Sequence, residues 1–121
     1  MSKFSHLDKK GNVKMVDVTD KPTTERTARA EGKISMKKET LALLLEEELP
    51  KGNVLTTAKL AGIQAAKKTS NLIPLCHPLN VSWVDIEFES EGDHILIKAV
   101  AKTKEATGIE MEVLAAVSVA A

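Results

Sequence analysis

The chain has 121 residues, of which 43% are hydrophobic and 28% charged, and this composition predicts one folded domain over residues 1–121 rather than a disordered chain. Seventeen basic residues balance seventeen acidic ones and aromatic residues make up only 2%, which argues against nucleic-acid binding. The single cysteine, Cys76, excludes an internal disulfide framework and a cysteine-rich zinc site, and no apolar run is long enough to span a bilayer. With no secretory leader, we expect a cytoplasmic protein.

The N-terminal part of the chain is expected to be extended. Residues 13–19 are rich in β-branched side chains, and the polar residues 20–24 are typical of a turn. Residues 27–36 then alternate small or apolar side chains with polar ones. This period of two predicts a half-buried strand.

Two helices are predicted next. Residues 36–48 place their apolar side chains on one helical stripe, with Ser35 as the expected N-cap. Pro50 and Gly52 interrupt this pattern, and a second helix is predicted from about 54 to 70. Its side chains are small enough for close packing, and Asn53 is its expected N-cap.

The C-terminal part predicts a hairpin followed by a helix. Residues 81–89 and 94–103 both alternate apolar and polar side chains, and a turn at 91–93 separates them. Residues 110–121 are rich in Ala, Leu and Val and predict a buried helix. The order of elements favours the α+β class, with an antiparallel sheet that carries helices on one face.

The segment 71–79 is the strongest candidate for chemistry, because Pro74 and Pro78 hold His77 between them on a stiff backbone. An imidazole there could carry a proton or bind phosphate. The alternative is a connector that contains a histidine by chance. A nucleophilic Cys76–His77 pair is disfavoured because neighbouring side chains on an extended chain point to opposite sides, and a metal site is disfavoured by the scattered histidines.

Lysines at both ends of the second predicted helix are further candidates. Lys51 lies between Pro50 and Gly52 at the start of that helix, where backbone N–H groups could also receive phosphate. Lys67 lies near its other end. For each lysine the alternative is a solvated side chain.

Glu110 and Glu112 flank Met111 just after Thr107 and Gly108. On an extended chain both carboxylates would face the same way, whereas in a regular helix they diverge by about 200°. A carboxylate pair could bind amino or hydroxyl groups or move a proton. The alternative is that both residues stabilise the positive end of a helix dipole.

Five strings together closely resemble the molybdenum cofactor biosynthesis protein C family, the cyclic pyranopterin monophosphate synthases. Two are specific: residues 73–79 read Ile-Pro-Leu-Cys-His-Pro-Leu, and residues 107–112 read Thr-Gly-Ile-Glu-Met-Glu. Residues 15–19, 51–54 and 61–67 supply the others. The resemblance runs along essentially the whole chain.

The resemblance implies a ferredoxin-like α+β subunit in a homo-hexamer, built as a trimer of dimers with active sites between subunits. It implies a lyase reaction in which a cyclised dihydro-GTP intermediate becomes cyclic pyranopterin monophosphate and pyrophosphate is released. The small-molecule substrate is thus a purine triphosphate derivative. No cofactor or bound metal is implied, and whether Mg²⁺ accompanies the triphosphate is left open.

The resemblance also assigns roles to individual residues. Lys51 and His77 match catalytic residues, which could donate a proton or hold phosphate. The matching substrate-binding residues are Leu75, Cys76, His77, Glu110, Met111 and Glu112, with Lys67, Asp17 and Arg26 as further members of the pocket.

The C-terminus departs from the family pattern. The family continues the last helix into a Tyr-Asp-Met-Cys-Lys segment with catalytic Asp and Lys, and residues 1–121 do not contain it. We therefore expect that the C-terminal part of the family domain lies outside this sequence, and that a chain ending at Ala121 would fold but not turn over. The alternative functions are a non-catalytic ferredoxin-like module that binds a nucleotide and regulates, or an RNA-binding sheet.

Overall fold

The computed structural model describes residues 12–121 except 14, 18, 20–21 and 47–52. Strands and helices alternate in groups along the described chain rather than one by one. In chain order the elements are β1 (Thr24–Ser35), α1 (Lys38–Leu45), α2 (Val54–Lys67), α3 (Thr69–Leu72), β2 (Trp83–Glu91), β3 (His94–Glu105) and α4 (Glu110–Ala120).

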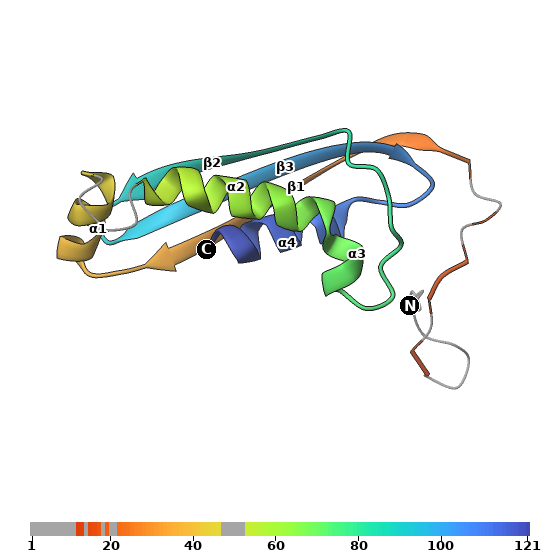
Figure 1. Ribbon diagram of the computed structural model, residues 1–121, viewed down its shortest axis with the longest axis horizontal. Helices are drawn as coiled ribbons and strands as arrows, with labels where there is room; N and C mark the ends of the chain where they lie inside the picture. Colours follow the sequence, from red (N-terminus) through yellow and green to blue (C-terminus); the bar gives the residue numbers. More distant parts are fainter. Residues whose placement is uncertain (1–11, 14, 18, 20–21, 47–52) are drawn as a thin grey trace, which may run out of the picture.

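The three strands form one antiparallel sheet in the order β1-β3-β2. In the register, Ala101 of β3 lies between Ala28 of β1 and Val84 of β2. β2 and β3 form the predicted hairpin, and Gly92 has the positive φ of 55° that its tight turn requires. Helices α2 and α4 cover one face of the sheet (Figure 1), so the predicted α+β class is confirmed.

The core lies between the sheet and these two helices. The period of two along β3 turns one set of its side chains, from Ile95 to Thr103, into the core. α4 supplies the opposite wall with Val113, Ala116 and Val117. This helix is apolar around most of its circumference because it packs against both α2 and the sheet.

Small residues set the distance between α2 and α4. A Cβ atom on Gly62 would lie 2.8 Å from the carbonyl oxygen of Ala116 and 3.1 Å from the Cβ of Ala120, and it would also overlap Ile86 of β2. Gly62 therefore permits a close approach of helix, helix and sheet at one point. Figure 1 shows that the two helices run in opposite directions, and the contact places the end of α4 beside the middle of α2.

Several predicted boundaries were wrong. Ser35 is the last residue of β1, and α1 begins after Lys37, whose side chain makes no cap hydrogen bond. Asn53 is the N-cap of α2 as predicted, since its side chain accepts a hydrogen bond from the N–H of Thr56 at 3.0 Å. The second predicted helix is divided at Lys68 into α2 and α3. In the described part of the chain, no helix is long and apolar enough to cross a membrane.

Candidate functional site

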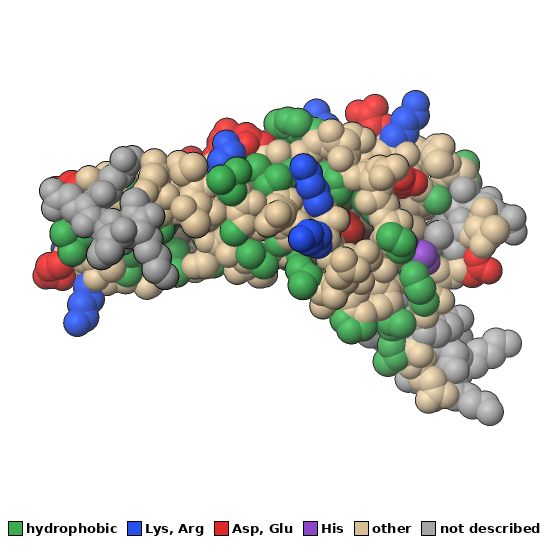
Figure 2. All heavy atoms as spheres, in the orientation of Figure 1, with side chains coloured by type: hydrophobic (Ala, Val, Ile, Leu, Met, Phe, Trp, Pro, Cys, Tyr) green, Lys and Arg blue, Asp and Glu red, His purple; other side chains and the backbone are tan. Residues whose placement is uncertain are grey.

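The candidate site lies at the end of the molecule where α3, the segment 73–82, the end of β3 and the start of α4 meet (Figure 1). Hydrophobic side chains gather over α3 and the segment that follows it (Figure 2). A small hollow of about 220 Å³ opens there between Ile73, Pro74, Leu75, Cys76 and Met111. Two of the predicted substrate-binding stretches therefore share one surface.

A strained turn orients the Cys76–His77 pair. The N–H of Cys76 donates to the carbonyl of Ile73 at 3.4 Å, with Pro74 as the second residue of the turn and Leu75 as the third. Leu75 has a φ of 66°, in the left-handed region that glycine normally occupies at this position of a type II turn. Such a backbone costs a leucine about 1–2 kcal/mol, and strain of this kind is found at functional sites.

The rest of this segment is fixed to the end of β3. The N–H of Asn80 donates to Glu105 Oε1 at 3.2 Å, and the Thr103 hydroxyl donates to the carbonyl of Asn80. The N–H of Ser82 donates to the carbonyl of Lys102 at 2.7 Å. His77 lies between the turn on one side and these anchors on the other.

One contact joins the two predicted stretches directly. The Sγ atom of Cys76 lies 3.6 Å from Oε2 of Glu112, across a separation of 36 residues in the chain. Glu112 is buried in the first turn of α4, with 3% of its surface exposed. Its other oxygen, Oε1, is buried and has no hydrogen-bond partner among the described residues. Glu112 is thus a buried acid with one oxygen that accepts no hydrogen bond from the described residues.

Burial controls the protonation of this pair. Removal from water raises the pKa of Glu112, while its own backbone N–H and the Cys76 thiol act to lower it and the charge of Glu110 acts to raise it. Burial, followed by the charge of Glu112 and the hydrogen bond to it, raises the pKa of the Cys76 thiol to about 11. At neutral pH Cys76 is therefore a protonated thiol that can donate a hydrogen bond.

Glu110 and Glu112 do not face the same way, because both lie in a regular helix. Glu112 points inward, whereas Glu110 is exposed and its carboxylate folds back over Gly108. A side chain at position 108 would occupy the same space as that carboxylate. Gly108 therefore permits the position of Glu110, a role that the sequence analysis did not assign to it.

Asp17 lies close enough to His77 for their charges to interact. The side-chain hydroxyl and backbone N–H of Thr19 donate to Asp17 Oδ1 at 2.7 and 2.9 Å. These hydrogen bonds hold the pKa of Asp17 below its usual value, and His77 acts in the same direction. The structure thus brings Asp17 to the same end of the molecule as His77.

The other predicted site residues have different positions. Arg26 is half-buried at the start of β1 and donates to the carbonyls of Glu105 and Ala106, each at 3.4 Å, so that it braces the chain just before Thr107. Lys67 is exposed in the last turn of α2. Lys51 lies outside the described residues.

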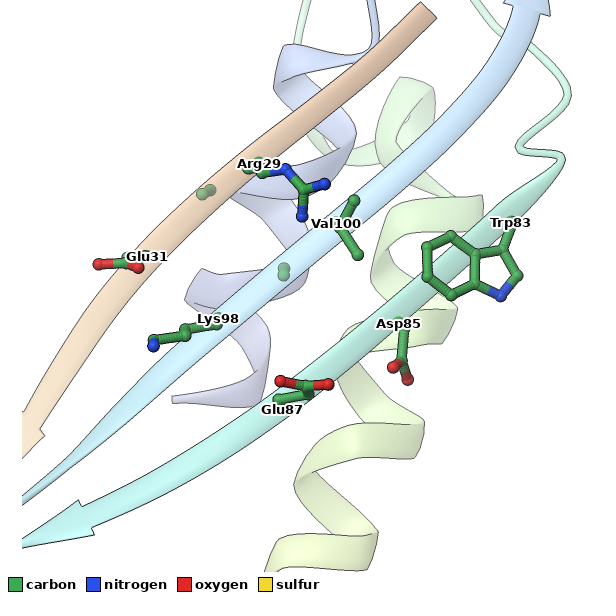
Figure 3. Close-up of a pocket in the computed structure, with 9 residues that line it drawn as sticks. Arg29, Glu31, Trp83, Asp85, Glu87, Lys98 and Val100 are labelled. Atoms are coloured by element: carbon green, nitrogen blue, oxygen red, sulfur yellow. The ribbon is translucent and has the colours of Figure 1, made fainter.

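A second hollow lies on the face of the sheet that α2 and α4 do not cover. It measures about 270 Å³ and lies among Arg29, Glu31, Trp83, Asp85, Glu87, Lys98 and Val100 (Figure 3). Its charged side chains alternate in sign across the strands, since Lys98 lies between Glu31 and Glu87. Lys98 also forms an ion pair with Glu89 at 2.9 Å. This surface contains none of the predicted site residues.

The described part of the chain contains no group of three or more His, Cys, Asp or Glu side chains that could hold a metal ion. The candidate site contains carboxylic acids, a thiol and an imidazole. These groups can hold or move protons and can accept hydrogen bonds from N–H groups of a ligand.

Comparison with known proteins places these residues in a family. Residues 15–121 match the model of the MoaC family. The chain is 64% identical over 118 residues to a molybdenum cofactor biosynthesis bifunctional protein of Chlorobaculum tepidum, covering 98% of this chain and 38% of that protein.

Two further relatives carry the name cyclic pyranopterin monophosphate synthase. The protein of Desulfatibacillum aliphaticivorans is 58% identical over 123 residues, which cover 100% of this chain and 77% of the relative. That of Oleidesulfovibrio alaskensis is 53% identical over 122 residues, which cover 99% of this chain and 77% of the relative. The family match and these identities confirm the resemblance carried by the motifs, and the chain belongs to the MoaC family.

Proposed function

We propose that this chain is a cyclic pyranopterin monophosphate synthase that acts in molybdenum cofactor biosynthesis. The observation that carries the proposal is the meeting of two motif stretches, residues 73–79 and 107–112, at one end of the fold through Cys76 and Glu112. Family membership and the names of relatives at 53% and 58% identity support it. In this proposal residues 1–121 belong to a single catalytic domain.

The reaction converts a cyclised dihydro-GTP intermediate into cyclic pyranopterin monophosphate and releases pyrophosphate. Opening the purine-derived ring and closing the pterin require proton transfers, and the phosphates require positive charge. Lys51 and His77 are proposed to transfer protons or to bind phosphate. Glu110 and Glu112 are proposed to hold amino groups of the base.

The remaining members of the pocket are proposed to bind and frame the substrate. Leu75, Cys76 and Met111 line the small hollow beside the acids. Asp17 adds a negative charge beside His77 and is proposed to orient its imidazole. Lys67 and Arg26 are proposed to add positive charge at the rim of the pocket and near Thr107, respectively.

We further propose that the site is shared between copies of the chain in a homo-hexamer. Asn53 caps the N-terminal end of α2, while Cys76 follows its C-terminal end. The 14 residues of α2 make a helix about 21 Å long. Lys51 precedes Asn53 by two positions in the sequence. A site shared between two copies would bring Lys51 of one copy to Glu112 of another, and the length of α2 supports this proposal.

A product assay tests the reaction. The full-length protein, together with any residues that continue the chain beyond Ala121, is incubated with the cyclised dihydro-GTP intermediate, and the products are identified by mass spectrometry. We expect cyclic pyranopterin monophosphate and an equal amount of pyrophosphate. Binding of the intermediate without product would contradict the proposed enzyme and favour a regulatory nucleotide-binding module.

Mixing inactive variants tests the shared site. Lys51→Ala and Glu112→Gln proteins are each assayed alone and then after they have been dissociated and reassembled together. If each site takes Lys51 and Glu112 from different copies, mixed assemblies contain some intact sites and recover activity. A mixture no more active than its components, at a stoichiometry verified by light scattering, would contradict the shared site.

We also propose that the protein works in the cytoplasm, where GTP is available.

A further inference from the structure

The contact between Cys76 and Glu112 has a property that the proposed reaction does not explain. The thiol sulfur lies 3.6 Å from Glu112 Oε2 and 3.8 Å from the carbonyl oxygen of His77. A thiol has one hydrogen to donate. The carboxylate oxygen is nearer and, when ionised, is the stronger acceptor, so the hydrogen is directed at Glu112.

The other oxygen of the same carboxylate is the unusual feature. Glu112 is 3% exposed, and Oε1 has no hydrogen-bond partner among the described residues. Native proteins rarely leave a buried acceptor unsatisfied, because its lost hydrogen bond to water is then not replaced. The terminal torsion of a glutamate is broad, so rotation could exchange the two oxygens. The hydrogen bond from Cys76 therefore determines which oxygen of Glu112 has a partner and which has none.

We propose that Cys76 is a positioning residue, whose S–H group donates to Oε2 of Glu112 and thereby presents Oε1 to an N–H or amino group of the bound purine-derived substrate. This inference rests on the proposed function for the identity of the ligand. The contact itself is independent of that function. Cys76 acts through Glu112, and no covalent bond to sulfur forms in this role.

The surrounding charges fit a donor rather than a nucleophile. From α4, Glu112 contacts the thiol and Glu110 adds a second negative charge beside Glu112. On the segment of Cys76 itself, His77 follows directly and interacts with Asp17. Burial and the charge of Glu112 raise the pKa of Cys76 to about 11, so the proton stays on sulfur near neutral pH.

The first test measures the reactivity of the thiol and needs no substrate. Cys76 is the only cysteine of residues 1–121, and mass spectrometry of its peptide separates its alkylation by iodoacetamide from that of any cysteine beyond Ala121. The rate follows the thiolate fraction. In Glu112→Gln the negative charge that helps to raise the thiol pKa is removed while its burial remains, and we expect alkylation at about pH 8 to accelerate on the order of ten-fold. An unchanged rate would overturn the proposal.

Two controls separate this effect from unfolding. Glu110→Gln changes a neighbouring carboxylate that does not contact the thiol, and its alkylation rate should stay within about two-fold of wild type. Circular dichroism verifies that each variant is folded. If Glu112→Gln does not fold, the S–H stretching band of the wild-type protein decides the question by Raman spectroscopy. A band shifted to lower frequency than that of free cysteine supports donation to Glu112, and an unshifted band overturns it.

The second test uses the reaction. Cys76→Ala removes the donor and should lower kcat/KM on the order of ten-fold, whereas Cys76→Ser keeps a donor and should restore most of that loss. Because the thiol hydrogen bond lowers the pKa of Glu112, the pH profile of Cys76→Ala should move its acidic limb to higher pH. Equal activities and identical profiles for the two variants would contradict positioning.

The two tests fail in distinguishable ways. If wild-type protein makes no product, the proposed function is wrong, while the thiol reactivity still decides whether Cys76 donates to Glu112. If product forms but alkylation is insensitive to Glu112→Gln, the synthase assignment stands and the positioning role is wrong.

Discussion

The hollow on the open face of the sheet and the hollow at the end of the molecule differ in how their charged side chains are paired. On the open face of the sheet, acidic and basic side chains alternate across the strands, and Lys98 is paired with Glu89 at 2.9 Å while both remain well exposed. At the end of the molecule, Glu112 is buried with one thiol partner and one oxygen without any partner among the described residues. Of these two hollows, the one on the open face is larger, and its charged side chains lie beside charges of opposite sign. Local imbalance, rather than size, marks the candidate site.

The largest expected effect compares one acid from each hollow. Glu112→Gln should lower kcat/KM by about 100-fold or more, because it replaces an ionisable group proposed to bind the substrate. Glu87→Gln on the open face should stay within about two-fold of wild type. Product formation measured for both variants by mass spectrometry tests this contrast. Equal losses would contradict the assignment of the site to Glu112.

The next effect concerns volume on the covered face of the sheet. Gly62→Ala places a methyl group against Ile86 and the backbone of Ala116, so the free energy of unfolding should fall by about 1–3 kcal/mol. Leu60→Ala changes a residue of the same helix that is 63% exposed, and the loss should be about 0.5 kcal/mol or less. Urea denaturation of both variants measures the difference. A tolerant Gly62 would mean that the helices separate at little cost.

A smaller effect depends on pH and tests the burial of Glu112. Its pKa in the folded chain is raised above the ordinary value of 4.5. The folded state therefore holds this proton more tightly than the unfolded state, and the resulting stabilisation is complete below pH 4.5 and is lost as the pH rises through the raised pKa. The stability of wild type relative to Glu112→Gln should decline across that window. A flat difference in urea midpoints from about pH 4 to about pH 8 would show that Glu112 is not desolvated.

The smallest effect belongs to the open face. Lys98→Ala removes an ion pair whose side chains are 38% and 50% exposed. Solvent and salt screen such pairs, so the urea midpoint should not change measurably at physiological ionic strength. A clear destabilisation would show that the alternating charges contribute to the free energy of unfolding.

The fold was predictable where the hydrophobic period was regular. The alternation in residues 94–103 and the apolar run after residue 110 located β3 and α4 correctly. Boundaries were less predictable where two signals compete, as at Ser35, which is a good N-cap by type but pairs with His94 in the sheet instead.

The residues of the candidate site could be named from the sequence, but their arrangement in space could not be predicted. The motifs identified Cys76 and Glu112 separately, yet their contact spans 36 residues and depends on the packing of α4 against α2 and the sheet. No local pattern reports that Glu112 would be buried and Glu110 exposed, because this depends on which side of α4 faces the core. The sequence also gave no sign that Leu75 adopts a positive φ.

The left-handed turn at Leu75 has a consequence for how this position tolerates substitution. Glycine or asparagine would relax the backbone there, whereas valine or isoleucine would add crowding beside Cβ to an already unfavourable conformation. Only a large apolar side chain, however, keeps the wall of the small hollow beside Met111. In a library randomised at position 75, variants chosen for folding and variants chosen for turnover should therefore diverge in residue type.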